Sequence, residues 1–125
     1  MSATTLRDHL VNALEDGKGQ DILALEVSKL TPITDYMVLV SGTSNRHVKA
    51  LVDRTVEAAK ECGEPPRGVE GRENYEWVLL DVGDVIVHVM QPAVRAYYNL
   101  EELWGGKTPQ PATAGIASAS RSSLG

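Results

Sequence analysis

The stretch WVLLDVGDVIVHVM, residues 77–90, decides the fold because its pattern is that of a β-hairpin. Two apolar runs, 77–82 and 85–90, flank the dipeptide Gly83-Asp84, which suits a two-residue hairpin turn. Side chains alternate between the two faces of a strand, so this turn gathers a row of aliphatic residues on one face. That row consists of Val78, Leu80, Val82, Val85, Val87 and Val89. We expect this face to lie in the core, covered by helices.

The opposite face of the hairpin is unusually apolar for a surface. It consists of Trp77, Leu79, Asp81, Ile86, His88 and Met90. A sheet face that is open to water normally carries polar side chains. Either this face is an exposed apolar patch that docks a partner, or another helix or the tail of the chain covers it. Trp77 favours the docking interpretation, because Trp is enriched among the residues that dominate interface energies.

The chain is acidic, with 17 Asp and Glu against 12 Lys and Arg and a net charge of −5. The acids that lie around the hairpin are Glu64, Glu70, Glu73, Glu76, Asp81 and Asp84. An acidic domain is a poor match for naked nucleic acid, whose phosphates are neutralised by Lys and Arg. These acids therefore form either an ordinary solvated surface or a rim that steers a basic protein partner toward the apolar face.

The order of the remaining elements predicts a small α/β domain. The expected elements are a helix over 6–16, strands over 21–27 and 36–41, a helix over 45–62, a short strand at 69–70, the hairpin strands and a helix over 92–103. This order predicts a mixed β-sheet with helices mainly on one face. We expect residues 1–105 to form a single domain and residues 106–125, rich in Ala, Ser, Pro and Gly, to be a disordered tail.

Polar and glycine residues mark the ends of the helices. Thr5 is expected to cap the first helix, with Asp8 completing an aspartate version of the capping box, and Gly17 to take the left-handed position after it. The second helix opens at Ser41-Gly42-Thr43-Ser44, where Thr43 or Ser44 would serve as the cap. An alternative is that the Gly42–Asn45 turn binds phosphate, as in a nucleotide-binding or nucleotidyl-transfer enzyme, although it matches neither glycine-rich nucleotide motif.

Nothing in the sequence predicts a metal, a cofactor or a catalytic residue. His9, His47 and His88 have no metal-ligand spacing, and His47 is expected to be solvated. The single cysteine, Cys62, cannot form an internal disulfide and fits a reducing cytoplasm. The sequence shows no signal peptide and no run of the roughly 20 apolar residues that cross a bilayer, so no membrane partner is expected.

Several motifs together resemble one known family. They are Ile33-Thr34-Asp35-Tyr36, Ser41-Gly42-Thr43-Ser44-Asn45-Arg46-His47-Val48, Gly68-Val69-Glu70-Gly71, the hairpin 77–90, and Tyr98-Asn99-Leu100-Glu101-Glu102-Leu103-Trp104. In these segments, over about residues 5–105, the chain resembles the ribosomal silencing factors, also called Iojap-like proteins. The resemblance implies a nucleotidyltransferase-like α/β fold without the catalytic acids, and hence no enzyme activity.

The resemblance also implies a function and a set of partner-facing residues. Members bind the large ribosomal subunit through its protein fourteen, at the surface that faces the small subunit. They sterically block subunit joining, lower translation when nutrients are short, are linked to large-subunit maturation and form homodimers when free. The positions that match the partner-facing residues are Trp77, Leu79, Asp81, His88 and Met90, with Glu70 and Tyr98 nearby and Tyr75 as a further candidate.

Overall fold

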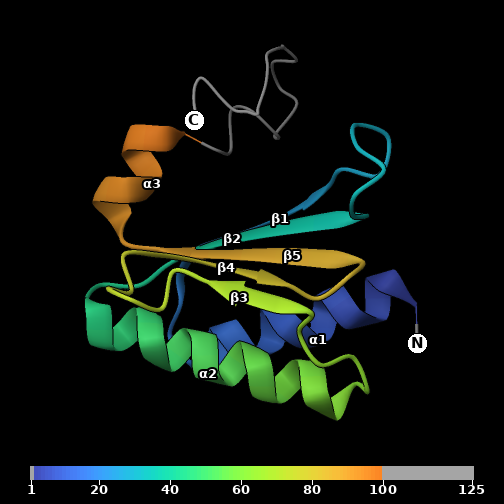
Figure 1. Ribbon diagram of the computed structural model, residues 1–125, viewed down its shortest axis with the longest axis horizontal. Helices are drawn as coiled ribbons and strands as arrows, with labels where there is room; N and C mark the ends of the chain where they lie inside the picture. The colour runs from blue at the N-terminus through green and yellow to red at the C-terminus, as the bar shows by residue number, and fades with distance from the viewer. Residues whose placement is uncertain (1, 100–125) are drawn as a thin grey trace. The chain divides into compact units, whose positions relative to one another are not determined.

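The computed structural model describes residues 2–99, and Figure 1 shows their arrangement. The chain divides into two compact units, residues 1–94 and 95–125, and each is treated by itself. The elements in chain order are α1 (Ala3–Asp16), β1 (Gln20–Glu26), β2 (Tyr36–Ser41), α2 (Asn45–Glu61), β3 (Gly68–Glu70), β4 (Trp77–Asp81), β5 (Val85–Met90) and α3 (Pro92–Tyr98).

The five strands form one mixed sheet in the order β1-β2-β5-β4-β3. β2 and β5 are parallel, and the other three neighbouring pairs are antiparallel. In the β4–β5 hairpin, Trp77 lies opposite Met90 and Leu79 opposite His88, as the turn at Gly83-Asp84 predicts. Gly83 adopts a φ of 82°, a left-handed conformation that suits glycine. The structure thus confirms a small mixed sheet, while the nucleotidyltransferase-like character stays a prediction.

The core lies between the sheet and the two long helices. Within residues 2–94, α1 and α2 lie on the same face of the sheet (Figure 1). The aliphatic row predicted for the hairpin is 0–2% exposed and joins residues of both helices in one cluster. The helix residues of that cluster are Leu6, Leu10, Leu14, Val48, Leu51, Val52, Ala58 and Ala59. Successive turns of each helix contribute residues three or four positions apart, with the buried Thr55 between Val52 and Ala58 on α2. This places one stripe of each helix on the sheet.

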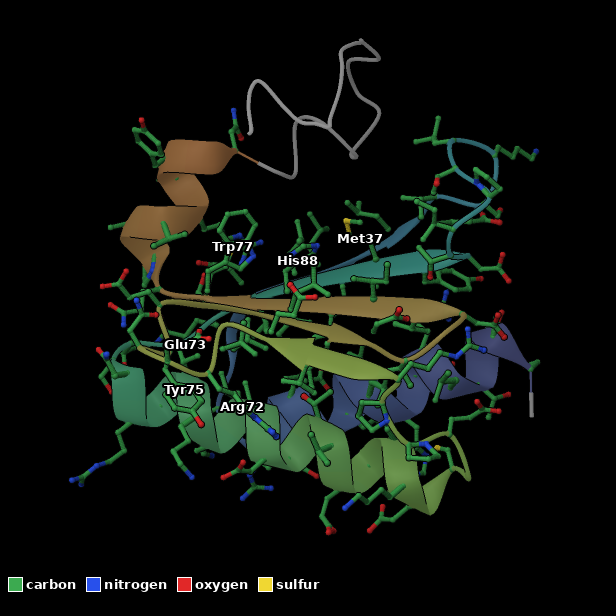
Figure 2. The ribbon with its side chains drawn as sticks, viewed as in Figure 1. Met37, Arg72, Glu73, Tyr75, Trp77 and His88 are labelled. Carbon is green, nitrogen blue, oxygen red and sulfur yellow. The ribbon has the colours of Figure 1, made fainter. Side chains whose placement is uncertain are left out.

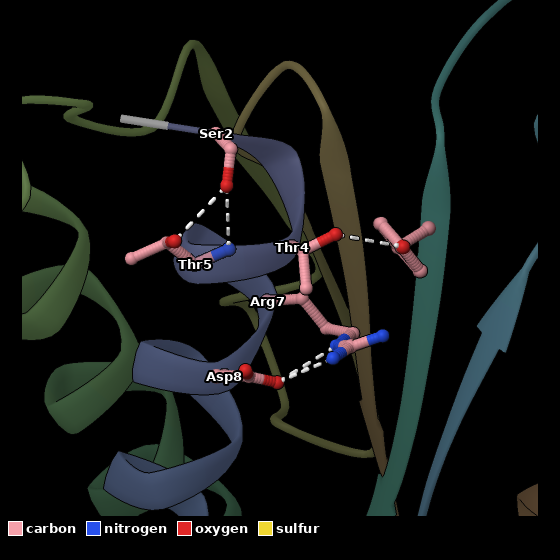
Figure 3. Close-up of polar contacts among 6 residues, drawn as sticks. Ser2, Thr4, Thr5, Arg7 and Asp8 are labelled. Carbon is pink, nitrogen blue, oxygen red and sulfur yellow. Dashed lines mark hydrogen bonds and ion pairs between the residues drawn. The ribbon is translucent and has the colours of Figure 1, made fainter.

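The predicted ends of α1 are wrong in three respects. Ser2, rather than Thr5, is the N-cap, because its side chain accepts a hydrogen bond from the Thr5 N–H at 3.1 Å (Figure 3). Asp8 does not complete a capping box and instead pairs with the Arg7 guanidinium at 2.7 Å. Gly17 has a φ of −84°, and the left-handed residue after the helix is Lys18, with a φ of 65°.

Gly17 is needed for a different reason. A Cβ atom built there would lie 2.7 Å from Cδ of Arg54 and 2.9 Å from Cδ2 of Leu51, so glycine permits the close approach of α1 to α2. At the other end of the described chain, α3 ends at Tyr98, and the part of the predicted helix beyond residue 99 lies outside the described residues. Asn99 has a φ of 53° and donates its N–H to the Arg95 carbonyl at 2.9 Å. The predicted disordered tail, 106–125, lies outside the described residues.

Candidate interaction face

The sheet surface that α1 and α2 leave uncovered within residues 2–94 is termed the helix-free face. The strand register assigns residues to it, because alternate positions on paired strands share a face. Its members are Leu23 and Leu25 on β1, Met37 and Leu39 on β2, Ile86, His88 and Met90 on β5, Trp77, Leu79 and Asp81 on β4, and Glu70 on β3. Most of them are apolar, so the predicted apolar face extends beyond the hairpin across four strands.

Burial on this face is greatest on the central strands. Met90 is 0% exposed and His88 6%, so the interpretation of the hairpin face as an exposed patch does not hold for these two residues. Both residues lie on the central strand β5, where His88 has Leu39 and Leu79 beside it and Met90 has Ser41 and Trp77. Trp77, Leu79, Asp81 and Ile86 are half-buried, and Leu23 and Leu25 on the edge strand are also partly open. The accessible part of the face therefore lies along β4, at Ile86 and along β1.

A hydrogen bond joins the two aromatic side chains of this face. Nε1 of Trp77 donates to Nδ1 of His88 at 3.0 Å, and the ring centroids are 5.9 Å apart (Figure 2). Since Nδ1 accepts this bond, the His88 imidazole is neutral and carries its hydrogen on Nε2. Burial lowers the pKa of His88 from 6.5 to about 4, which keeps the ring in the accepting form at neutral pH. His88 thus fixes the position of the Trp77 indole through this hydrogen bond.

The loop before β4 determines where Trp77 enters the sheet. Gly71 has a φ of 100°, and a Cβ atom there would lie 2.1 Å from the carbonyl oxygen of Trp77. Asn45, at the start of α2, donates from Nδ2 to the Asn74 carbonyl and accepts from Nε2 of Gln91 at 2.8 Å. The Gln91 N–H also donates to the Glu76 carbonyl at 3.0 Å. These hydrogen bonds attach the loop before β4, at Asn74 and Glu76, to the start of α2 and to the residue after β5.

Four other candidate residues differ in position or role. Tyr75 packs against the core on the helix side of the sheet, so the structure separates it from Trp77 (Figure 2). Glu70 is exposed on β3 opposite Leu79, at the edge of the helix-free face. Asp81 accepts the Gly83 N–H at 2.9 Å and so closes the hairpin turn. The side chain of Tyr98 lies outside the described residues.

The turn before α2 is a helix cap, as expected, and His47 is a bridge. The Ser44 side chain accepts the His47 N–H at 3.1 Å. Nδ1 of His47 accepts the Thr43 N–H at 2.9 Å, and its Nε2 donates to the Gly17 carbonyl at 3.0 Å. The expectation that His47 is merely solvated is wrong, because the ring links the start of α2 to the end of α1. The Thr43 and His47 N–H groups therefore already have hydrogen-bond acceptors within the protein. This weakens the interpretation that the turn binds phosphate.

Among residues 2–99, no three His, Cys, Asp or Glu side chains come together in a way that could hold a metal ion. None of the helices in that range is both long and apolar enough to span a bilayer. Burial, followed by the neighbouring carboxylates Glu61 and Glu64, raises the pKa of the Cys62 thiol and lowers its reactivity.

Comparisons with known proteins place the chain in a family. The family described as "Ribosomal silencing factor during starvation" matches residues 1–123. A ribosomal silencing factor from Chromobacterium violaceum is 54% identical over 99 residues, which are 79% of this chain and 81% of that protein. A crystal structure from the same organism has a TM-score of 0.83 at 49% identity, covering 88% of this chain and 92% of that one. A mouse protein named for mitochondrial assembly of the ribosomal large subunit is 37% identical over 100 residues, 78% of this chain and 44% of its own length. The chain therefore belongs to the ribosomal silencing factor family.

Proposed function

We propose that this protein binds the large ribosomal subunit through protein fourteen, at the surface that faces the small subunit, and blocks subunit joining. Translation would then fall when nutrients are short. Family membership supports the proposal, and so does the mouse relative, whose name refers to assembly of the large subunit. A contribution to large-subunit maturation is part of the same proposal. The protein acts here by occupying space, so no bond is made or broken and no catalytic residue is needed.

The observation that carries the proposal is the apolar composition of the helix-free face. Trp77 and Leu79 lie two positions apart on β4, and Ile86 lies on β5 opposite Asp81. All three remain half-buried, although the other face of the same hairpin is almost completely buried. Apolar side chains gathered on one surface are typical of docking sites. Burying an aromatic side chain removes on the order of 150–250 Å² from water. At about 25 cal/mol/Å² this is worth about 4–6 kcal/mol for a fully exposed ring, and less for the partly covered Trp77.

Charge indicates what kind of surface the face would meet. Glu70 and Asp81 lie on the face itself, while Glu73, Glu76 and Asp84 are exposed on the adjoining loops. Carboxylates around an apolar centre steer a basic partner and orient it, and they repel phosphate backbones. A basic protein surface on the ribosome fits this arrangement better than naked RNA does.

His88 and Met90 contribute to the proposed interface indirectly. Both are buried, and His88 holds the Trp77 indole through its Nδ1 atom. A side chain that is already fixed loses less conformational entropy when a partner binds. The face therefore presents a fixed aromatic anchor rather than a mobile one.

Replacement of Trp77 by alanine tests the proposal. We expect W77A to bind isolated large subunits at least about 30-fold more weakly, or about 2 kcal/mol, as is typical of an interface hot spot. Co-sedimentation of purified protein with large and small subunits measures this, and circular dichroism checks that the variant folds. Lys49→Ala, on the exposed side of α2, is the matched control and should bind normally. A folded W77A protein that co-migrates with large subunits as the wild type does would remove Trp77 from the interface.

Two alternatives give different results. A nucleotide-binding module at Gly42–Asn45 would bind nucleoside triphosphate with Mg²⁺ in calorimetry, and would lose that binding when the turn is disrupted. A homodimeric scaffold would self-associate and leave ribosomal subunits unbound. Mass measurements over a range of concentrations, with and without large subunits, separate a free homodimer from a ribosome-bound monomer.

A further inference from the structure

The loop between β1 and β2 carries the most exposed large apolar side chains found within residues 2–94. Leu30 is 58% exposed and Ile33 is 74% exposed. The loop projects away from the sheet on the side opposite α1 and α2, which is the side of the helix-free face (Figure 1). Two large aliphatic residues held in water at neighbouring positions have an unfavourable hydration free energy that a binding partner would relieve.

Hydrogen bonds hold this loop in one conformation. The Val27 carbonyl accepts from the N–H groups of Leu30 at 2.8 Å and Thr31 at 3.0 Å. The Ile33 N–H donates to Oγ1 of Thr31 at 3.1 Å. The loop is also anchored by Val27, which is 0% exposed, and Thr34, which is 5% exposed. Its apolar side chains are therefore displayed on a rigid support, which lowers the entropy lost on binding.

The loop is continuous with the helix-free face. The N–H groups of Asp35 and Tyr36 both donate to the Asp84 carbonyl, at 3.1 and 3.0 Å, so the loop is tied to the β4–β5 turn. Just beyond this junction the face begins with Met37 beside Ile86, and Leu25 lies opposite Met37 on β1. The accessible apolar side chains between Trp77 and the loop are Leu79, Ile86 and Leu25, and Met37, which is 5% exposed, lies between the last two.

Carboxylates surround the junction between the loop and the face. Asp84 is exposed, and Asp35 and Asp81 are half-buried, against two cations, Lys29 in the loop and Arg67, whose guanidinium lies beside Gly83. A second copy of this acidic chain would bring like charges together, and a nucleic acid would be repelled. The chemistry that fits is a basic protein surface with an apolar recess.

We infer that Leu30 and Ile33 form a second apolar anchor, which inserts into the same basic ribosomal protein surface that contacts Trp77. The inference rests on the proposed function and adds to it the extent of the interface. A β-strand rises about 3.3 Å per residue, so the strands and the loop together span a length on the order of 20 Å. That length suits a protein interface of standard size, about 800 Å² on each partner.

A double substitution in the loop tests the inference. L30S/I33S changes exposed side chains only, so the fold should be retained, and we expect about tenfold weaker binding to isolated large subunits. The matched control is L30M/I33M, which keeps both side chains apolar and should bind within about twofold of the wild type. Affinity is measured by co-sedimentation or by fluorescence titration of labelled protein, alongside W77A.

The possible results separate this inference from the proposed function. Wild-type protein that fails to bind large subunits would overturn both. Binding that W77A weakens but L30S/I33S leaves unchanged would overturn only the inference about the loop. Sedimentation equilibrium tests whether the loop instead contacts a second copy of the chain. An L30S/I33S variant that loses self-association but binds the large subunit normally would show this, and would also overturn the inference.

Discussion

Acidification should destabilise this protein through one residue, His88. Its imidazole is 6% exposed and accepts the Trp77 indole N–H at Nδ1. Protonation at Nδ1 would remove the acceptor and place a charge in the buried centre of the sheet. Burial accordingly lowers the pKa of His88 from 6.5 to about 4 in the folded protein. The unfolded chain therefore binds this proton at a higher pH than the native protein does.

The sign and size of the effect follow from linkage. The contribution of neutral His88 to stability is fully present above pH 6.5, is lost as the pH falls from 6.5 toward 4, and does not change further below that. Over that window the free energy of unfolding falls by at most about 1.4 kcal/mol for each pH unit. The expected loss relative to neutral pH is about 2 kcal/mol at pH 5 and about 3 kcal/mol at pH 4.

Urea denaturation at pH 7 and pH 5, followed by tryptophan fluorescence, measures this loss. The comparison is with His88→Gln, which carries no proton in this range, so the variant should lose about 2 kcal/mol less than the wild type between the two conditions. Equal losses in the two proteins would refute the argument, as would an NMR titration that places His88 near 6.5.

Two further substitutions test how the site is supported. Gly71→Ala should cost more than about 2 kcal/mol in chemical denaturation, because its φ is 100° and the new methyl group would meet the Trp77 carbonyl oxygen. Gly68→Ala is its control and should be nearly neutral, because no atom lies within 4 Å of the added Cβ; similar losses in both would contradict this account. Ser44→Ala should lower stability by about 1 kcal/mol through loss of the cap on the His47 N–H. An unchanged thermal midpoint would show that the cap does not matter.

The parts of the fold that were predictable depend on short-range signals. The hairpin register follows from Gly83-Asp84 and from alternation along the two strands. The bounds of α2 follow from its apolar period and the turn residues at its ends. The caps of α1 were harder to predict, because Ser2 and Thr5 are both good caps. Gly17 is glycine for its contact with Leu51 and Arg54, which no local signal reveals.

The candidate site could be predicted only in outline. Alternation along the hairpin correctly places Trp77 and His88 on one face, but the burial of His88 depends on Leu39, which the sheet brings beside it from β2. The bridge from His47 to Gly17 joins residues 30 positions apart, so spacing alone cannot indicate it. The exposed pair at 30 and 33 was also missed, since apolar residues in a loop give no sign of whether they fold inward.

The parallel pairing of β2 with β5 has a consequence for how the chain assembles. β1 with β2 and β4 with β5 are hairpins between neighbouring strands, whereas β2 meets β5 only after residues 42–84 have been looped out. Contacts between neighbouring strands close short loops at low entropic cost, so the two hairpins should form before β2 pairs with β5. Met37 on β2 and Ile86 on β5 come together only in that last pairing. A chain in which β2 and β5 have not yet paired would have no complete docking face. The proposed silencing activity would therefore be restricted to the fully folded protein.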